Sequence, residues 1–279
     1  MYFLSDYGLV DEFVGVVHAV IQRAAPGVPV VDLTHQVPAF DVGAAARVLE
    51  RAAPHLGPGV VLAVVDPGVG SGRRGVVLEV GTGTVEVGTG VGPRWMVGPD
   101  NGLLLPAAAL LGGPRRAVTL AGASTFDGRD VFGPAAAHLV AGGAMEALGP
   151  PIDVDGLEAL PTGPVSVSVS AGVLTTSVTW VDGYGNVQLA GDGPTWDQLG
   201  LDLGTTVSVE PLDPALPLRP VRARRVSAFS SLEPGELGLL VDANGQHALV
   251  LDRASAAAAL GIDGPGPVLR VQVRGGIGE

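Results

Sequence analysis

Hydrophobic positions in the first 150 residues form two kinds of pattern that alternate along the chain. Val60–Val65 is a continuous apolar run rich in valine, typical of a strand covered on both faces. Asp11–Ala24 has apolar residues three or four positions apart and acidic residues at its start, which predicts a helix. The same criteria predict further strands at Tyr2–Leu4, Val28–Leu33, Val76–Val80 and Ala117–Leu120, and helices from Asp41 to about Ala53 and over Pro134–Val140. This alternation predicts an α/β fold with a mostly parallel sheet and flanking helices.

The pattern changes near residue 160. Gly149-Pro150-Pro151 and Pro161-Thr162-Gly163-Pro164 bound a segment of weak periodicity, which we interpret as a linker. Short alternating strands are expected beyond it, at Val165–Val169, Leu174–Val181, Thr206–Val209, Gly238–Val241 and Ala248–Leu251. The sequence therefore predicts an N-terminal α/β domain over residues 1–160 and a smaller C-terminal antiparallel, β-barrel-like domain over residues 161–279. Within the first domain, the glycine-rich segment Gly81–Gly92 is expected to hold a hairpin turn.

Composition narrows the classes of function. Apolar residues make up 47% of the chain and charged residues 16%, and the formal net charge is −12. All 16 basic residues are arginine, and no basic stripe is present, so nucleic acid and anionic membranes are poor candidate partners. The chain has no cysteine, which excludes disulfides and thiolate sites. No signal-like segment and no apolar run of about 20 residues is found, so we expect a cytoplasmic protein.

Acidic residues follow three of the predicted parallel strands. Asp6, Asp32 and Asp66 each stand at or near the carboxyl end of such a strand. Ligands of open α/β sheets bind beyond these ends, so the three side chains should lie along one edge. A single aspartate here is more often a turn cap, but three in register favour a functional site.

Several familiar motifs are absent or out of context. Gly70–Gly75 matches G-x-G-x-x-G, but it leads into a strand, whereas the dinucleotide fingerprint needs a helix N-terminus. A P-loop needs a lysine, and the chain has none. Neither H-E-x-x-H nor G-x-S-x-G occurs, and no pair of the five histidines has metal-ligand spacing. The sequence therefore predicts a site without a metal.

Six short strings carry a stronger signal when they are taken together. They are Phe3–Gly8, Asp32–His35, Val65–Gly70, Gly98–Gly102, Thr125–Asp130 and Asp182–Asn186. In this order and spacing the chain closely resembles the S-adenosyl-L-methionine (SAM) hydroxide adenosyltransferase family, the hydrolytic relatives of the fluorinase and chlorinase. The resemblance covers nearly the whole chain, including the change of pattern near residue 160.

The resemblance implies hydrolysis of SAM to adenosine and methionine with no added cofactor. It also implies a homotrimer, with SAM between one subunit's N-terminal domain and a neighbour's C-terminal domain. Asp6 would bind the ribose hydroxyls, Asp182 the methionine ammonium, and Asn186 the adenine edge. The further side chains placed at the substrate are Phe40, Tyr184 and Asn244. For Phe40 core packing is an equally good interpretation, and Asp182–Asn186 alone would be an ordinary turn.

The expected catalytic set is Asp66, Arg73 and Asp127. Members of the family hold the attacking water with an Asp–Arg–His set, in which Asp66 and Arg73 match the first two positions and Arg74 is the less favoured arginine. Asp127 stands where the family has histidine. Two carboxylates beside one guanidinium could still provide a base, because mutual repulsion raises one pKa. In Asp242-Ala243-Asn244-Gly245, Ala243 replaces a serine that helps hold the methionine end, and Asn244 could compensate.

Two alternatives remain open from the sequence. The first is a SAM-dependent transferase that uses another nucleophile, such as a halide. Carboxylates at positions 66 and 127 would repel an anion, which argues for water. The second alternative is a non-catalytic protein that binds SAM or adenosine, suggested by Asp127 and Ala243.

Overall fold

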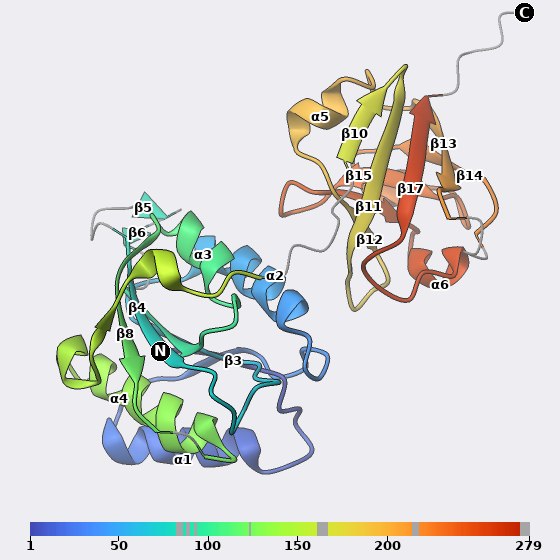
Figure 1. The fold of residues 1–279 in the computed structure, drawn as a ribbon. Helices are drawn as coiled ribbons and strands as arrows, with labels where there is room; N and C mark the ends of the chain where they lie inside the picture. Colours follow the sequence, from blue (N-terminus) through green and yellow to red (C-terminus); the bar gives the residue numbers. More distant parts are fainter. Residues whose placement is uncertain are drawn as a thin grey trace, which may run out of the picture. The chain divides into compact units, whose positions relative to one another are not determined.

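The computed structural model describes residues 1–81, 86–87, 90–91, 94–122, 124–160, 167–213 and 218–273. The chain divides into two compact units, Met1–Pro161 and Thr162–Glu279. Figure 1 shows an open sheet with helices in the first unit and a closed arrangement of strands in the second. Each unit is described by itself.

The first unit is built on a seven-stranded sheet with the order β2-β1-β3-β7-β4-β8-β9. The strands are β1 (Tyr2–Ser5), β2 (Val31–Thr34), β3 (Val60–Val64), β4 (Gly75–Val80), β7 (Trp95–Pro99), β8 (Pro114–Leu120) and β9 (Pro151–Ile152). Strands β2, β1, β3 and β7 are parallel, and the pairs β7–β4, β4–β8 and β8–β9 are antiparallel. Five of the seven strands therefore run in one direction, which confirms the predicted mostly parallel sheet.

Helices pack on both faces of this sheet (Figure 1). They are α1 (Phe13–Ala24), α2 (Val42–Ala52), α3 (Leu105–Leu110) and α4 (Gly133–Val140), with single turns η1 (Ala53–His55), η3 (Met145–Ala147) and η4 (Val154–Gly156) and a π-helical turn, η2 (Gly128–Phe132). Helix α1 packs against α4, and α2 packs against α3. Asp41 caps α2, as predicted, since its carboxylate accepts from the backbone N–H of Ala44 at 2.8 Å.

The core under α1 and α4 follows the alternation of side chains along β3. Val60, Leu62 and Val64 point into it and meet Val17 and Ile21 of α1. All five residues of β3 are buried, so the strand is covered on both faces, as its continuous apolar run predicted. This central position fixes the end of β3, and with it the backbone that carries Asp66.

Two segments differ from their sequence predictions. Strand β2 begins at Val31, because only Val31–Thr34 is in register with β1. The first part of the expected linker belongs to the N-terminal unit, since Pro151–Ile152 adds β9 to the sheet edge. In the glycine-rich segment, β5 (Glu86–Val87) and β6 (Gly90–Val91) form an antiparallel pair; residues 82–85, 88–89 and 92–93 lie outside the described residues.

The second unit is a barrel with one additional strand. Its strands are β10 (Val167–Ser170), β11 (Val173–Val181), β12 (Val187–Leu189), β13 (Thr206–Pro211), β14 (Val221–Arg225), β15 (Gly238–Val241), β16 (His247–Val250) and β17 (Val268–Val273). The ring β11-β12-β16-β15-β14-β13-β17 closes through the β11–β17 pairing, and β10 flanks β11. All neighbours are antiparallel except β14 and β15, which confirms the predicted barrel-like fold. The short helices α5 (Gly193–Asp197) and α6 (Ala256–Leu260) and the turn η5 (Phe229–Ser231) complete the unit.

Candidate active site

A pocket of about 230 Å³ lies at the carboxyl ends of β1 and β3. Its walls include Asp6 and Asp66, which follow these strands, and Asp127. The rest of the lining is Tyr7, Phe13, Ala39, Phe40, Val64, Val69, Thr125, Phe126 and Gly128. The expectation that strand-end acids meet at one edge is thus met by Asp6 and Asp66. Asp32 is not part of the lining; its Oδ1 is hydrogen-bonded to His18 Nε2 at 2.9 Å and lies 3.0 Å from His35 Nε2.

Arg73 joins the two predicted catalytic carboxylates. Its Nε donates to Asp66 Oδ1 at 3.0 Å, and its Nη2 donates both to Asp66 Oδ2 and to Asp127 Oδ2, the latter at 2.8 Å. Its Nη1 donates to the carbonyl of Arg74, and the guanidinium lies 5.3 Å from the ring centre of Phe132. All three nitrogen atoms of the guanidinium therefore donate hydrogen bonds. A forked contact of this kind fixes both carboxylates in position.

The three groups are nearly removed from water. Their side chains are only 5–11% exposed. Burial raises the pKa of the Asp66 carboxyl, and the Asp127 carboxylate adds to the rise; the Arg73 charge and hydrogen bonds and the backbone N–H of Gly68 oppose it. A carboxyl with a raised pKa is a better proton acceptor once it is ionised. Such perturbed groups in a pocket are typical of catalytic sites.

Asp127 is positioned by its own turn. Its Oδ1 accepts from the backbone N–H of Ser124 at 2.7 Å, which leaves Oδ2 for Arg73. The π-helical turn η2 begins at the next residue, Gly128, and such turns are frequent at functional sites. A Cβ at Gly128 would lie 2.1 Å from the hydroxyl of Tyr7, so glycine is required for this packing.

The sequence analysis did not single out Tyr7. Its ring lines the pocket, and its pKa is raised by burial first and then by Asp6, Asp66 and Asp127. The phenol therefore remains a neutral hydroxyl, a donor beside three carboxylates. The signal that could have found it is its position next to Asp6, two residues beyond the end of β1.

Asp6 and Phe40 are linked directly. The backbone N–H of Phe40 donates to Asp6 Oδ2 at 2.9 Å, and Phe40 adopts φ = 66°, an uncommon conformation for an aromatic residue. The ring is 71% exposed and lines the pocket, so core packing is excluded as its role in this chain. Strained backbone of this kind is often kept at ligand sites.

The candidate residues of the second unit lie in two similar turns. Between β11 and β12, Asp182 Oδ1 accepts from the backbone N–H groups of Tyr184 and Asn186, and Asn186 Nδ2 donates to Asp182 Oδ2 at 2.8 Å. The Tyr184 side chain is 83% exposed. These hydrogen bonds all lie within the turn, as expected if Asp182–Asn186 is an ordinary turn. A carboxylate has about four acceptor positions, so Asp182 can still bind a cation.

Asn244 belongs to the second turn, between β15 and β16. Its backbone N–H donates to Asp242 Oδ1 at 2.8 Å, as does that of Gln246 at 2.9 Å, and Asn244 is exposed. Gln188 of β12 donates to Asp242 Oδ2 at 2.5 Å and ties this turn to the neighbouring strand. The two turns thus share one hydrogen-bond pattern at sites 60 residues apart.

Comparison with known proteins decides the family. Residues 1–149 match the model of the SAM hydroxide adenosyltransferase N-terminal domain. The whole chain is 42% identical over 277 residues to a protein of Salinispora tropica named (R)-S-adenosyl-L-methionine hydrolase, with 96% of each chain covered. The chain belongs to the SAM hydroxide adenosyltransferase family. A protein of Thermus thermophilus with the same name is 48% identical over 178 residues, covering 58% of this chain and 64% of that protein. A fluorinase of Actinoplanes sp. is more distant, at 27% identity over 206 residues, covering 66% of this chain and 69% of the fluorinase.

Two solved structures are similar to the chain over nearly its whole length. An uncharacterized conserved protein from Thermotoga maritima has a TM-score of 0.83 and 29% identity, covering 97% of this chain and 99% of that one. A conserved hypothetical protein from Thermus thermophilus has a TM-score of 0.70 and 36% identity, with 98% of both chains covered. Both matches extend across the two units.

One of the strings that carry the resemblance to the family, Gly98–Gly102, has a structural role. Arg74 pairs with Asp100 and donates to the carbonyl of Gly156, whereas its neighbour Arg73 bridges Asp66 and Asp127. Asp100 also accepts from the backbone N–H of Glu158. A Cβ at Gly98 would lie 2.3 Å from the carbonyl oxygen of Ala63, so β7 approaches β3 closely at this glycine.

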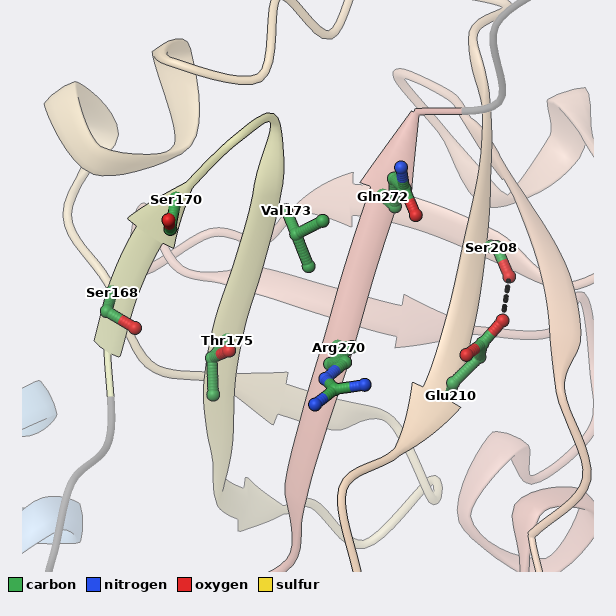
Figure 2. A pocket seen from close by; sticks show the side chains of 8 residues that line it. All are labelled: Ser168, Ser170, Val173, Thr175, Ser208, Glu210, Arg270 and Gln272. Atoms are coloured by element: carbon green, nitrogen blue, oxygen red, sulfur yellow. Dashed lines mark hydrogen bonds between the residues drawn. The ribbon is translucent and has the colours of Figure 1, made fainter.

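A second concavity lies on the outer face of the barrel and has a different character. Figure 2 shows polar side chains of β10, β11, β13 and β17 around it, with Ser208 donating to Glu210 at 3.1 Å. Glu210 and Arg270 are its only charged lining residues among those described. It lacks the paired buried acids of the first unit, and its one carboxylate among the described residues, Glu210, is exposed. Among the described helices, none is long and apolar enough to span a bilayer.

Proposed function

We propose that this chain hydrolyses SAM to adenosine and L-methionine at the pocket of the first unit. The observation that carries the proposal is the bridge from Arg73 to the buried carboxylates of Asp66 and Asp127, beside Asp6. Asp66 and Asp127 line the pocket, and Arg73, which is not itself a lining residue, holds both carboxylates from outside the lining. A potential base with a fixed positive partner supports the expected catalytic set. The relatives from Salinispora tropica and Thermus thermophilus, both named as hydrolases of SAM, support the same reaction.

The step is a displacement at the ribose 5′-carbon. A water oxygen forms the new C–O bond while the C–S bond breaks, and the electron pair of that bond neutralises the sulfonium sulfur of the departing methionine. The water loses one proton to Asp66, which releases it to solvent afterwards. Because the sulfonium is already a good leaving group, alignment and deprotonation of water are the main tasks of the protein, and we propose no cofactor.

Charge selects both the substrate and the nucleophile. Ionised Asp66 and Asp127 with Arg73 carry a net charge of −1, which attracts a sulfonium cation and repels a halide. In a site this dry, the repulsion of an anion is much larger than in water. Water, a neutral nucleophile, is therefore favoured over chloride or fluoride.

Substrate contacts are proposed from both units. Asp6 would accept hydrogen bonds from the ribose hydroxyls, since its Oδ1 takes no hydrogen bond among those described, and the exposed ring of Phe40 would pack on the ligand. Asp182, Tyr184, Asn186 and Asn244 would come from a neighbouring subunit of a homotrimer. The exposure of Tyr184 and Asn244, together with that of Phe40, is consistent with surfaces that meet in an assembly. We also propose that the enzyme works in the cytoplasm without nucleic acid or membrane partners, in keeping with its net charge of −12.

The direct test is incubation of purified protein with SAM, with and without chloride, followed by chromatography. Adenosine and methionine are expected in equal amounts, at a rate that chloride does not change. Formation of 5′-chloroadenosine would establish the halide-using alternative, and unchanged SAM that nevertheless binds would establish the non-catalytic one. Because the relatives are named for the (R) sulfonium epimer, that epimer should be turned over faster than (S).

A further inference from the structure

Three side chains that the pocket does not use converge beside β2. His18 lies on α1, Asp32 lies on β2, and His35 follows that strand. Asp32 Oδ1 is 2.9 Å from His18 Nε2 and 3.0 Å from His35 Nε2. One ligand atom from each residue lies within 4.8 Å of the others. Two imidazoles and a carboxylate form a donor set typical of zinc.

His35 is the unusual member of this cluster. It is only 3% exposed, and its Nε2 is fully buried without a hydrogen bond, because its approach to Asp32 Oδ1 lacks hydrogen-bonding geometry. The other ring nitrogen, Nδ1, lies 2.7 Å from Ser5 Oγ. A buried polar atom without a partner is costly and needs an explanation.

The partner of Nδ1 suggests that explanation. When Nδ1 donates its proton to Ser5 Oγ, Nε2 carries a lone pair directed into the cluster, 3.0 Å from a carboxylate oxygen. Two electron-rich atoms at this distance repel each other unless a proton or a metal cation lies between them, and the contact lacks the geometry of a hydrogen bond. Histidines that bind metals commonly have such a partner on the second nitrogen, which fixes the tautomer and the ring orientation.

Packing holds both rings in place. The centroid of Phe3 lies 4.5 Å from that of His35 and 5.9 Å from that of His18, and Phe3 is itself completely buried. The opposite side is open, since the His18 and Asp32 side chains are 34% and 40% exposed. The cluster therefore has a rigid apolar wall on one side and access to solvent on the other.

We propose that His18, Asp32 and His35 bind a zinc ion, with water as the fourth ligand. Tetrahedral zinc with bonds of about 2.0–2.1 Å places its ligand atoms roughly 3.3 Å apart. The observed separations of 2.9 and 3.0 Å need to widen by only a few tenths of an ångström. No sequence pattern indicated this site, because the two histidines lie on different elements.

The zinc site is structural and takes no part in the displacement. None of its three ligands lines the pocket, but Ser5 precedes Asp6, and the backbone N–H of Gly8 donates to the carbonyl of His35 at 2.7 Å. Bound zinc would therefore stiffen the Ser5–Gly8 segment that carries Asp6 and Tyr7. The inference is independent of the proposed reaction and is tested by metal binding alone.

The experiment uses the full chain without an affinity tag. Zinc is added to metal-free protein, and binding is followed by calorimetry and by elemental analysis after dialysis, with Co²⁺ absorption as a probe of tetrahedral geometry. We expect one zinc per chain and a rise in melting temperature. His18→Ala should weaken binding at least tenfold and abolish that rise. The exposed His55, outside the cluster, provides the control variant His55→Ala, which should bind as the wild type does.

The variants separate a specific site from loose surface binding. A spectrum of tetrahedral Co²⁺ that is lost in both His18→Ala and Asp32→Asn would support the site, provided that circular dichroism shows both variants folded. The site does not exist if the wild type binds less than one zinc per chain at micromolar concentrations. The same conclusion follows if His18→Ala and His55→Ala bind zinc equally well.

Discussion

At the residue scale, the site depends on the proton balance of two carboxylates that share one guanidinium. The Asp66 carboxylate accepts hydrogen bonds from both Nε and Nη2 of Arg73. The Asp127 carboxylate accepts from Nη2 alone and from the backbone N–H of Ser124. The pKa of Asp66 is raised by burial and further by Asp127. We therefore expect that Asp127, at the position where the resemblance implies a histidine, acts by raising the pKa of Asp66, the proposed base.

The pH profile should reveal this coupling. If ionised Asp66 accepts the proton, activity rises with pH through its pKa. Asp127→Asn removes a negative charge that raises this pKa, so the acidic limb of kcat should move to lower pH and activity on that limb should rise several-fold. Steady-state rates of adenosine formation between about pH 4 and 9 measure the shift.

The control for this variant is Asp130→Asn. Asp130 is exposed and pairs with Arg129, so the substitution should leave the limb in place. If the acidic limb of kcat in Asp127→Asn stays in place or moves to higher pH, Asp66 is not a base coupled to Asp127.

At the element scale, the π-helical turn η2 and the end of β1 fit together through one close contact. Gly128 begins η2, and the space that a side chain would need there is filled by the hydroxyl of Tyr7. Tyr7 and Phe13 also contact the ring of Phe126 edge-on, so two elements far apart in the sequence form one aromatic wall of the pocket. The position of Asp127 follows from this packing.

Gly128→Ala should destabilise the protein by about 1–3 kcal/mol, since the added methyl overlaps the phenol oxygen of a buried side chain. Tyr7→Phe in the same chain should recover most of that loss by removing the oxygen. The free energy of unfolding in urea measures both effects.

A matched glycine distinguishes this clash from a general effect of alanine. Gly15 lies within α1 with open space around its Cβ position, so Gly15→Ala should be neutral or stabilising by up to about 1 kcal/mol. If Gly128→Ala is as stable as Gly15→Ala, the contact with Tyr7 does not constrain η2.

At the scale of the whole molecule, the candidate residues are divided between two units. Asp6, Asp66, Arg73 and Asp127 belong to the first, and Asp182, Asn186 and Asn244 belong to the second. The barrel turns that carry the latter group are rigid, because aspartate side chains satisfy their backbone N–H groups. A substrate site shared between subunits would require both units in one assembly.

Mixing two inactive variants tests the shared site. Asp66→Asn disables the first unit and Asp182→Ala the second, so neither homotrimer should turn over SAM. When the two are unfolded together and refolded, about a quarter of the sites should combine an intact first unit with an intact neighbouring second unit. Recovery of about that fraction of wild-type activity is expected, and the trimer is checked by sedimentation.

The control mixes Asp66→Asn with Arg73→Ala, two inactive variants that both alter the first unit. This mixture should recover no activity, because every site then contains one altered first unit. Recovery in the control, or none in the test mixture, would rule out sites shared between subunits.

The sequence determined the elements and the proposed chemistry. The apolar run of β3 required a strand buried on both faces, and Asp66 at its end could then only lie at the ligand-binding edge. The six strings, taken in order, indicated the family, and that resemblance predicted Arg73 and Asp127 as members of the catalytic set. These signals are local, because a strand, a cap or a turn depends on a few neighbouring residues.

Only the tertiary structure decided which side chains share a partner. Three strand-end aspartates look alike in the sequence, yet Asp66 pairs with Arg73 while Asp32 turns to His18 and His35. The same holds for Arg73 and Arg74, adjacent in the chain and paired with different acids. Successive residues of extended chain point to opposite sides, and the packing of distant elements determines which groups they meet. For that reason the sequence predicted the edge at which the acids lie, and only the fold distinguished Asp66, the proposed base, from Asp32, a proposed zinc ligand.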